Sequence, residues 1–256
     1  MGKVYLVGAG PGDEELITVK GLRAIQEADV ILYDRLINSK LLNEARQEAE
    51  LIFCGKEPNK HGLIQDRINE QLVFHAQQDK VVTRLKGGDP FIFGRGGEEA
   101  LILEEHHIPY EVVPGITSGI SAAAYAGIPL THRQVSGSVS FINGSKPEER
   151  TDQEWLYLAN GADTLCFYMG VKSFPAIREK LLQAGLPAST PIAFIHWGTF
   201  AHQKTIKGEL GTIIERLPEI SNPSMVVIGE VVRLSDQLKW FEENPENWFD
   251  YTSTQV

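Results

Sequence analysis

Short apolar runs alternate with amphipathic stretches through the first half of the chain. Runs rich in β-branched residues, which are typical of buried strands, occur at residues 4–7, 30–33, 51–54, 81–85 and 110–113. Apolar positions with helical spacing predict helices over residues 14–27, 63–77 and 98–106. Asp13 is the predicted N-cap of the first of these helices. Strands separated by helices predict a mainly parallel sheet that is covered on both faces.

The second half repeats this pattern after a junction near residues 114–118. A helix of small residues is predicted over residues 118–125, and four further strands follow at 139–142, 164–168, 191–195 and 225–229, with a helix at 176–182. We therefore expect an α/β protein with an N-terminal domain over 1–114, a C-terminal domain over 115–241 and a polar tail over 242–256.

The most unusual segment is glycine-rich and covers residues 87–99, directly after one predicted strand and before a helix. Its thirteen residues include five glycines and one proline. Glycines gather in this way where the backbone approaches another group closely or takes positive φ angles. A tight turn would need only one or two of them. Because open α/β sheets bind ligands beyond the carboxyl ends of their strands, we expect a ligand site here.

A second glycine-rich loop, residues 8–13, follows the first predicted strand. Its spacing is GxGxG, and Pro11 stands where a dinucleotide-binding loop would supply an N–H group. We therefore do not expect pyrophosphate binding, and we expect the loop to form the floor of the ligand site.

Several polar side chains lie beside these loops. Asp34 and Lys56 each come just after a predicted strand, so they should face the same sheet edge as the glycine-rich segment. A carboxylate and an amine there suit acid–base chemistry, but position alone favours a surface ion pair equally. Thr117 and Ser118 stand at a helix start, where capping accounts for one hydroxyl. His132 beside Arg133 is most simply a solvated loop histidine.

Composition excludes several classes of function. The net charge of −10 disfavours non-specific nucleic-acid binding and attachment to an anionic membrane. No apolar run approaches the roughly 20 residues that span a bilayer, and the chain starts with a strand, not an apolar leader. Cys54 and Cys166 form no metal-binding motif and are expected to be buried, inert thiols. We expect an intracellular protein without a metal site.

Six segments together resemble one known family. They are residues 8–13, 33–36, 87–99, 113–117, 127–133 and 167–170. In this combination the chain resembles the uroporphyrinogen-III C-methyltransferase group of the tetrapyrrole methylase superfamily, over residues 3–241. The loop at 8–13 marks only the superfamily, whereas 87–99 together with 127–133 marks this group.

The resemblance implies two α/β domains with a ligand cleft between them, usually in a homodimer, and the expected location is the cytoplasm. It also implies transfer of methyl groups from S-adenosyl-L-methionine to C2 and C7 of uroporphyrinogen III, which yields precorrin-2 for sirohaem and/or cobalamin and leaves S-adenosyl-L-homocysteine. By the same resemblance Asp34 is the proton acceptor and Lys56 the proton donor. The implied cofactor-binding residues are Pro11, Gly87, Gly88, Asp89, Ile92, Thr117, Ser118, Met169 and Gly198.

Basic residues in these segments provide an independent check, because the substrate is a polycarboxylate and the protein is acidic. The cations in or beside them are Arg35, Lys56, Arg84, Lys86, Arg95, His132 and Arg133. We expect Arg35, Arg95, His132 and Arg133 to hold the substrate carboxylates.

Three alternatives remain. Another methylase of the superfamily, such as a precorrin-4 methyltransferase, is the nearest, and a relative acting on ribosomal RNA ribose is disfavoured by the acidic composition. A non-catalytic nucleotide-binding regulator would leave Asp34, Lys56 and the arginines without a role.

Overall fold

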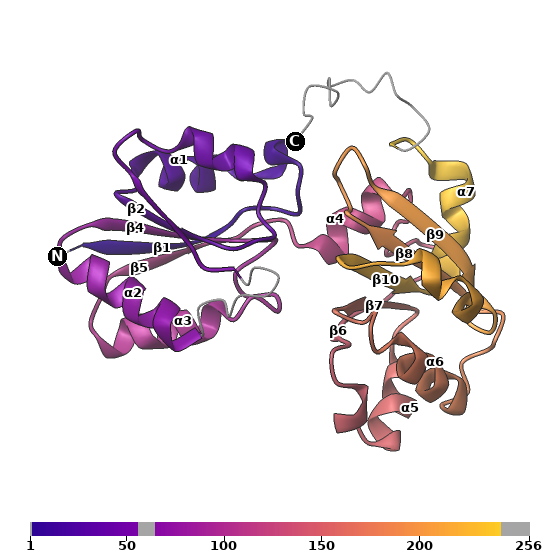
Figure 1. The fold of residues 1–256 in the computed structure, drawn as a ribbon. Helices are drawn as coiled ribbons and strands as arrows, with labels where there is room; N and C mark the ends of the chain where they lie inside the picture. Colours follow the sequence, from indigo (N-terminus) through magenta and orange to yellow (C-terminus); the bar gives the residue numbers. More distant parts are fainter. Residues whose placement is uncertain (1, 56–64, 242–256) are drawn as a thin grey trace. The chain divides into compact units, whose positions relative to one another are not determined.

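The computed structural model describes residues 2–55 and 65–241 and divides the chain into two compact units, Met1–Thr117 and Ser118–Val256. Each unit is built on a five-stranded sheet with helices packed against it (Figure 1). The units are called unit 1 and unit 2 below.

The sheet of unit 1 is parallel throughout, as the sequence predicted. Its strands, in sheet order, are β3 (Glu50–Phe53), β2 (Val30–Tyr33), β4 (Val81–Lys86), β1 (Lys3–Gly8) and β5 (Tyr110–Val113). Buried, mostly aliphatic strands of this kind need cover on both faces.

Helices supply that cover. They are α1 (Val19–Glu27), α2 (Gln65–Gln77) and α3 (Gly96–Glu105), with short 3-10 helices η1 (Glu14–Leu16) and η2 (Ser39–Glu44). α1 packs its Ala24 and Ile25 on one face, whereas α2 and α3 pack on the other (Figure 1). Because side chains alternate along a strand, successive residues of each strand meet opposite layers of helix.

The predicted helix over 14–27 is wrong at its start. Asp13 caps only the short η1, accepting a hydrogen bond from the Glu15 N–H. The backbone is then extended at Ile17, and Thr18 caps α1 by accepting from the Gly21 N–H. A second cap within one apolar pattern therefore divides the segment into two helices.

Unit 2 has a mixed sheet. Its strands, in sheet order, are β6 (Val139–Asn143), β7 (Thr164–Tyr168), β10 (Ser224–Ile228), β8 (Pro191–His196) and β9 (Lys204–Glu209). β6 and β7 are parallel, whereas β10 is antiparallel to both β7 and β8, and β9 is antiparallel to β8. The sequence analysis missed β9, because this edge strand buries only Ile206.

The helices of unit 2 also lie on both faces of the sheet. They are α4 (Ser118–Tyr125), α5 (Asp152–Gly161), α6 (Phe174–Gln183) and α7 (Ser235–Leu238), with the 3-10 helices η3 (Pro147–Glu149), η4 (Ile213–Glu219) and η5 (Glu230–Leu234). Of these, α5 was also missed by the sequence analysis. α5 and α6 share one core with the sheet, and the small residues of α4 pack on the opposite face.

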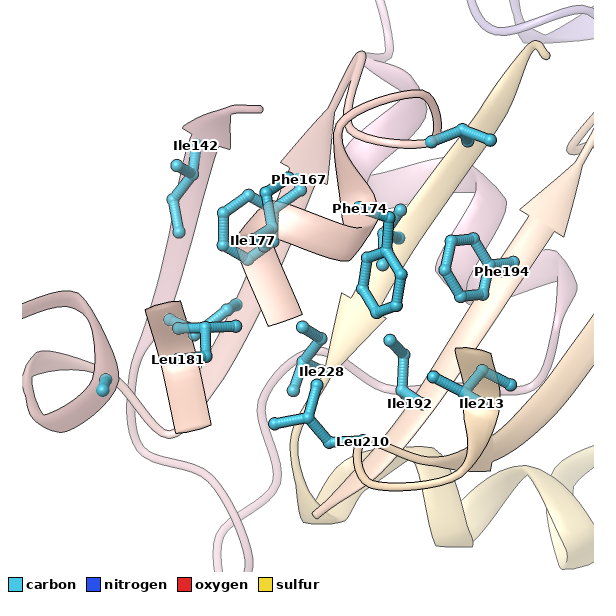
Figure 2. Packing of buried hydrophobic residues seen from close by; sticks show 14 of the residues in the cluster. Ile142, Phe167, Phe174, Ile177, Leu181, Ile192, Phe194, Leu210, Ile213 and Ile228 are labelled. Carbon is cyan, nitrogen blue, oxygen red and sulfur yellow. The ribbon is translucent and has the colours of Figure 1, made fainter. Parts of the chain in front are cut away.

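The larger core of unit 2 is aromatic and aliphatic. Phe174 of α6 meets Phe194 of β8 edge to face, with ring centroids 4.8 Å apart (Figure 2). Trp155 of α5 stacks on Phe167 of β7. All four side chains are buried, so this core fixes both helices on the sheet.

Candidate active site

The carboxyl ends of the unit 1 strands meet at one edge of the sheet, because all five strands run in the same direction. Asp34 follows β2 there, and the loops that begin at Ala9, Gly87 and Pro114 follow β1, β4 and β5. Lys56, the predicted proton donor, lies outside the described residues.

This edge contains a topological switch point. β1 and β4 are neighbours, yet the helix after β1 (α1) covers one face and the helix after β4 (α3) covers the other. Open α/β sheets bind ligands in the crevice where neighbouring connections diverge in this way. The two glycine-rich loops of the sequence start at these two strand ends.

Backbone contacts join the glycine-rich loops. Gly88 N–H donates to the Gly10 carbonyl at 2.7 Å, and Gly10 N–H donates back at 3.2 Å. A Cβ placed on Gly8 would lie 2.6 Å from the Gly88 carbonyl oxygen, and one on Gly115 only 2.2 Å from it. Three loops therefore pack backbone on backbone. Gly97 differs, since its added Cβ would meet nothing within 4 Å.

Asp89 organises the loop after β4. Its Oδ1 accepts from the N–H groups of Phe91 at 2.8 Å and Ile92 at 3.2 Å, and its Oδ2 accepts from the Gly115 N–H at 3.0 Å. Both oxygens thus shape the loop and tie it to the end of β5. The side chains of Phe91, Ile92 and Phe93 remain substantially exposed.

Three charged side chains are buried beneath this edge. Arg84 and Lys86 alternate on β4 and so point to the same face, where Glu99 of α3 lies fully buried. Glu99 Oε1 accepts from Arg84 Nε at 3.1 Å, Lys86 Nζ at 2.8 Å and Gln65 Nε2 at 3.1 Å. Arg84 and Lys86 were counted above among the cations in or beside the site segments, but both are paired with Glu99 inside the unit.

Asp34 completes this network at the surface. Its Oδ1 accepts from Arg84 Nη2 at 2.6 Å, and its side chain is 30% exposed whereas that of Arg84 is 2% exposed. Burial alone lowers the pKa of Arg84, but the carboxylates of Asp34 and Glu99 outweigh burial and hold that pKa above its ordinary value. Burial, with the adjacent Arg84 charge, lowers the pKa of Lys86.

Sequence reasoning missed Glu99 as part of the site. The available signal was two cations at alternate positions of a buried strand, which require a buried counter-charge. The glutamates in the first turn of the following helix, Glu98 and Glu99, were the candidates.

In unit 2 the predicted residues Met169 and Gly198 share a sheet edge. β7 and β8 are both antiparallel to β10, so they are parallel to each other, and these residues lie just beyond their carboxyl ends. Met169 is half-exposed with φ 55°. A Cβ on Gly198 would lie 2.5 Å from the Ala122 Cβ of α4, so packing alone requires this glycine.

The predicted hydroxyl residues fall on either side of the division between the units. Thr117 ends unit 1 and is buried. Ser118 starts α4, and its hydroxyl donates to Met225 Sδ at 3.9 Å. The next N–H, that of Gly119, donates to the Tyr168 hydroxyl at 2.9 Å. These bonds anchor the start of α4 on β7 and β10.

The four cations assigned to the substrate differ in their surroundings. Arg95 is exposed, has φ 59°, and forms a two-point ion pair with Glu98 at 2.8 and 2.6 Å. Arg35 and Arg133 are exposed. His132 is half-buried, with its Nδ1 3.3 Å from the Gln134 N–H. Arg35 and Arg95 belong to unit 1, and the other two to unit 2.

Both cysteines are buried and free, as predicted. Burial raises the pKa of Cys54 to about 11 and that of Cys166 to about 12. Over residues 2–55 and 65–241, no three His, Cys, Asp or Glu side chains gather as metal ligands. No helix in the same ranges is long and apolar enough to cross a membrane.

Comparisons with known proteins agree with this architecture. A family model described as Tetrapyrrole (Corrin/Porphyrin) Methylases matches residues 3–214. The chain is 58% identical over 238 residues to a uroporphyrinogen-III C-methyltransferase of Priestia megaterium, covering 92% of this chain and all of that protein.

Two solved structures share the fold. One is a uroporphyrin-III C-methyltransferase of Thermus thermophilus complexed with S-adenosyl homocysteine, with TM-score 0.78 and 38% identity over 91% of this chain and 99% of that one. The other is a cobalt precorrin-4 methyltransferase, with TM-score 0.79 and 25% identity over 90% of this chain and 95% of that one. These matches confirm the predicted fold class. The two structures match the fold about equally well, whereas the sequence is more similar to the uroporphyrin-III C-methyltransferase than to the cobalt precorrin-4 methyltransferase.

Proposed function

Since the chain belongs to the tetrapyrrole (corrin/porphyrin) methylase family, we infer that it is a uroporphyrinogen-III C-methyltransferase that uses S-adenosyl-L-methionine. It methylates C2 and C7 of uroporphyrinogen III to give precorrin-2, for sirohaem and/or cobalamin. The observation that carries this proposal is the 58% identity over the full length of a relative with that name.

The methyl donor is assigned to residues of the strand-end loops. The proposed binding residues are Pro11, Gly87, Gly88, Asp89, Ile92, Thr117, Ser118, Met169 and Gly198. The switch point and the loops that Asp89 and the Gly10–Gly88 pair hold together support a preformed site on unit 1. When bound, S-adenosyl-L-methionine supplies an already activated sulfonium methyl group, so the protein needs no covalent nucleophile. Positioning of the reacting carbon then supplies much of the catalysis.

Asp34 is the proposed proton acceptor. A pyrrole carbon that gains a methyl group requires a base to take a proton as the ring system rearranges. Asp34 stands at the sheet edge with Oδ1 held by Arg84, and we assign the proton to its other oxygen, Oδ2. Lys56 remains the proposed proton donor.

Arg35, Arg95, His132 and Arg133 are proposed to bind the acetate and propionate arms of the substrate. The exposed Arg95–Glu98 pair is of the kind that contributes little to stability, so Arg95 can exchange Glu98 for a substrate carboxylate. Guanidinium groups hold carboxylates at two points, which offsets the repulsion expected from a net charge of −10.

We further propose a cytoplasmic homodimer that acts on a small-molecule tetrapyrrole and binds neither nucleic acid nor membrane. The alternative is a precorrin-4 methyltransferase. A cobalt precorrin-4 methyltransferase shares the fold, but its sequence is only 25% identical to this chain.

The test is incubation of the purified chain with enzymatically generated uroporphyrinogen III and S-adenosyl-L-methionine. The expected result is red fluorescence from the oxidised methylated product, absent without the methyl donor. Turnover of precorrin-4 but not of uroporphyrinogen III would favour the alternative.

The role of Asp34 has its own test. Asp34→Asn should lower kcat far more than it weakens binding of S-adenosyl-L-homocysteine, measured by calorimetry.

A further inference from the structure

The buried charges beneath Asp34 form one connected network. Glu99 is fully buried, and its Oε1 receives three donors, from Arg84, Lys86 and Gln65. Its Oε2 is also buried, with no hydrogen-bond partner among the described residues. Burying charges costs free energy, and a well-packed apolar cluster of similar volume would often be at least as stable. Stability alone therefore does not account for this arrangement.

The guanidinium of Arg84 connects Glu99 to Asp34. Its Nε binds Glu99 at 3.1 Å, and its Nη2 binds Asp34 Oδ1 at 2.6 Å. Its Nη1 lies 3.4 Å from the carbonyl oxygens of both Leu32 and Leu85. Because a guanidinium is planar and rigid, fixing Nε fixes the direction in which Nη2 donates.

The network reaches solvent at Asp34. The side chains of Arg84, Lys86 and Glu99 are at most 3% exposed, whereas that of Asp34 is 30% exposed at the carboxyl edge of the sheet. The two cations and two carboxylates balance in charge. Loss of the Glu99 charge would leave two buried cations with Asp34 as their one carboxylate in this set, and would weaken the hold on the Nε side of the guanidinium.

We propose that Glu99 is a positioning residue for methyl transfer: acting through Arg84, it fixes the carboxylate of Asp34 at the site. This inference rests on the proposed role of Asp34 as proton acceptor. Glu99 lies beneath the site and acts on the reaction through the orientation of Asp34.

A double-mutant cycle tests the proposal. Glu99→Gln keeps the size of the side chain and removes its charge, and Glu105→Gln, on the exposed end of the same helix, is the matched control. We expect Glu99→Gln to lower kcat about 10- to 100-fold, because a neutral amide oxygen holds the Arg84 guanidinium more weakly than a carboxylate does. The KM for S-adenosyl-L-methionine should stay within about twofold, and Glu99→Asp should recover part of kcat.

The decisive measurement is Glu99→Gln in an Asp34→Asn background. If Glu99 acts through Asp34, it should cause little further loss there. If the loss of kcat in the double variant were the product of the two single losses, the positioning role would be overturned and the role of Asp34 would stand. An unchanged kcat in Glu99→Gln alone would have the same consequence. Parent kcat in Asp34→Asn would instead refute the proposed function of Asp34, and the positioning role with it.

A variant that keeps the charge balance covers the case in which Glu99→Gln does not fold. Lys86→Gln combined with Glu99→Gln removes one charge of each sign and retains the Arg84–Asp34 pair. Its loss of kcat should likewise disappear when Asp34 is already Asn, and a multiplied loss would again refute the proposal.

Discussion

Replacing Gly115 by alanine tests whether the strand-end loops of unit 1 pack as tightly as the structure shows. The new Cβ would lie 2.2 Å from the Gly88 carbonyl oxygen and 2.7 Å from the Gly8 Cα. Ordinary contacts begin near 3.5 Å, so backbone must move by roughly 1 Å. The displaced Gly88 carbonyl accepts a hydrogen bond from the Gly10 N–H, and the Gly88 N–H donates one to the Gly10 carbonyl.

The expected cost follows from these contacts. Overpacking of a tight region costs about 1–3 kcal/mol, and each weakened backbone hydrogen bond adds about 0.5–1.5 kcal/mol. We therefore expect Gly115→Ala to lower the free energy of unfolding by about 2–6 kcal/mol and to weaken binding of S-adenosyl-L-homocysteine.

Gly97→Ala is the matched control, because its Cβ meets nothing within 4 Å and the residue lies in the first turn of α3. It should be neutral or stabilise by up to about 1 kcal/mol. Urea unfolding measures the stability and calorimetry measures binding. Equal stability of the two variants, or unchanged ligand affinity in Gly115→Ala, would refute the reasoning.

Three further outcomes are expected. Phe174→Ala should cost about 3–5 kcal/mol in urea unfolding, because this fully buried ring packs on Phe194; a loss below 1 kcal/mol would contradict the packing. Cys54 and Cys166 should resist an aromatic disulfide reagent at pH 8 and react only after denaturation, since burial raises their pKa values to about 11 and about 12. Burial, followed by the charge of Lys80, lowers the pKa of His75 below 6.5, so the unfolded state binds the proton more readily and stability should fall as pH drops below 6.5. That pH dependence should shrink in His75→Gln.

The sequence predicted the strands of unit 1 well for a physical reason. A strand such as β2 is buried on both faces, so its apolar run stands out from the polar loops around it. The edge strand β9 carries lysines, a threonine and a glutamate, and it could be identified only from its pairing with β8. The break at Thr18 was hidden because the apolar spacing continues across it.

The sequence predicted where the site lies better than it predicted which charged side chains pair with one another there. The place of Asp34 after β2 follows from the strand pattern, as does that of the glycine-rich loop after β4. Arg84 and Lys86 were counted among the cations in or beside the site, because a sequence shows that two cations share a strand face but not which side chain pairs with them. Their partner, Glu99, comes from a helix whose packing depends on the whole unit.

The most direct test of the proposed function is the fate of the transferred carbon. The chain would be incubated with uroporphyrinogen III and S-adenosyl-L-methionine carrying a ¹³C-labelled methyl group, and the product examined by carbon NMR. The account predicts labelled methyl groups bonded to C2 and C7 of the tetrapyrrole and nowhere else. Label at any other carbon, or no transfer to uroporphyrinogen III by folded protein that binds S-adenosyl-L-homocysteine, would contradict it.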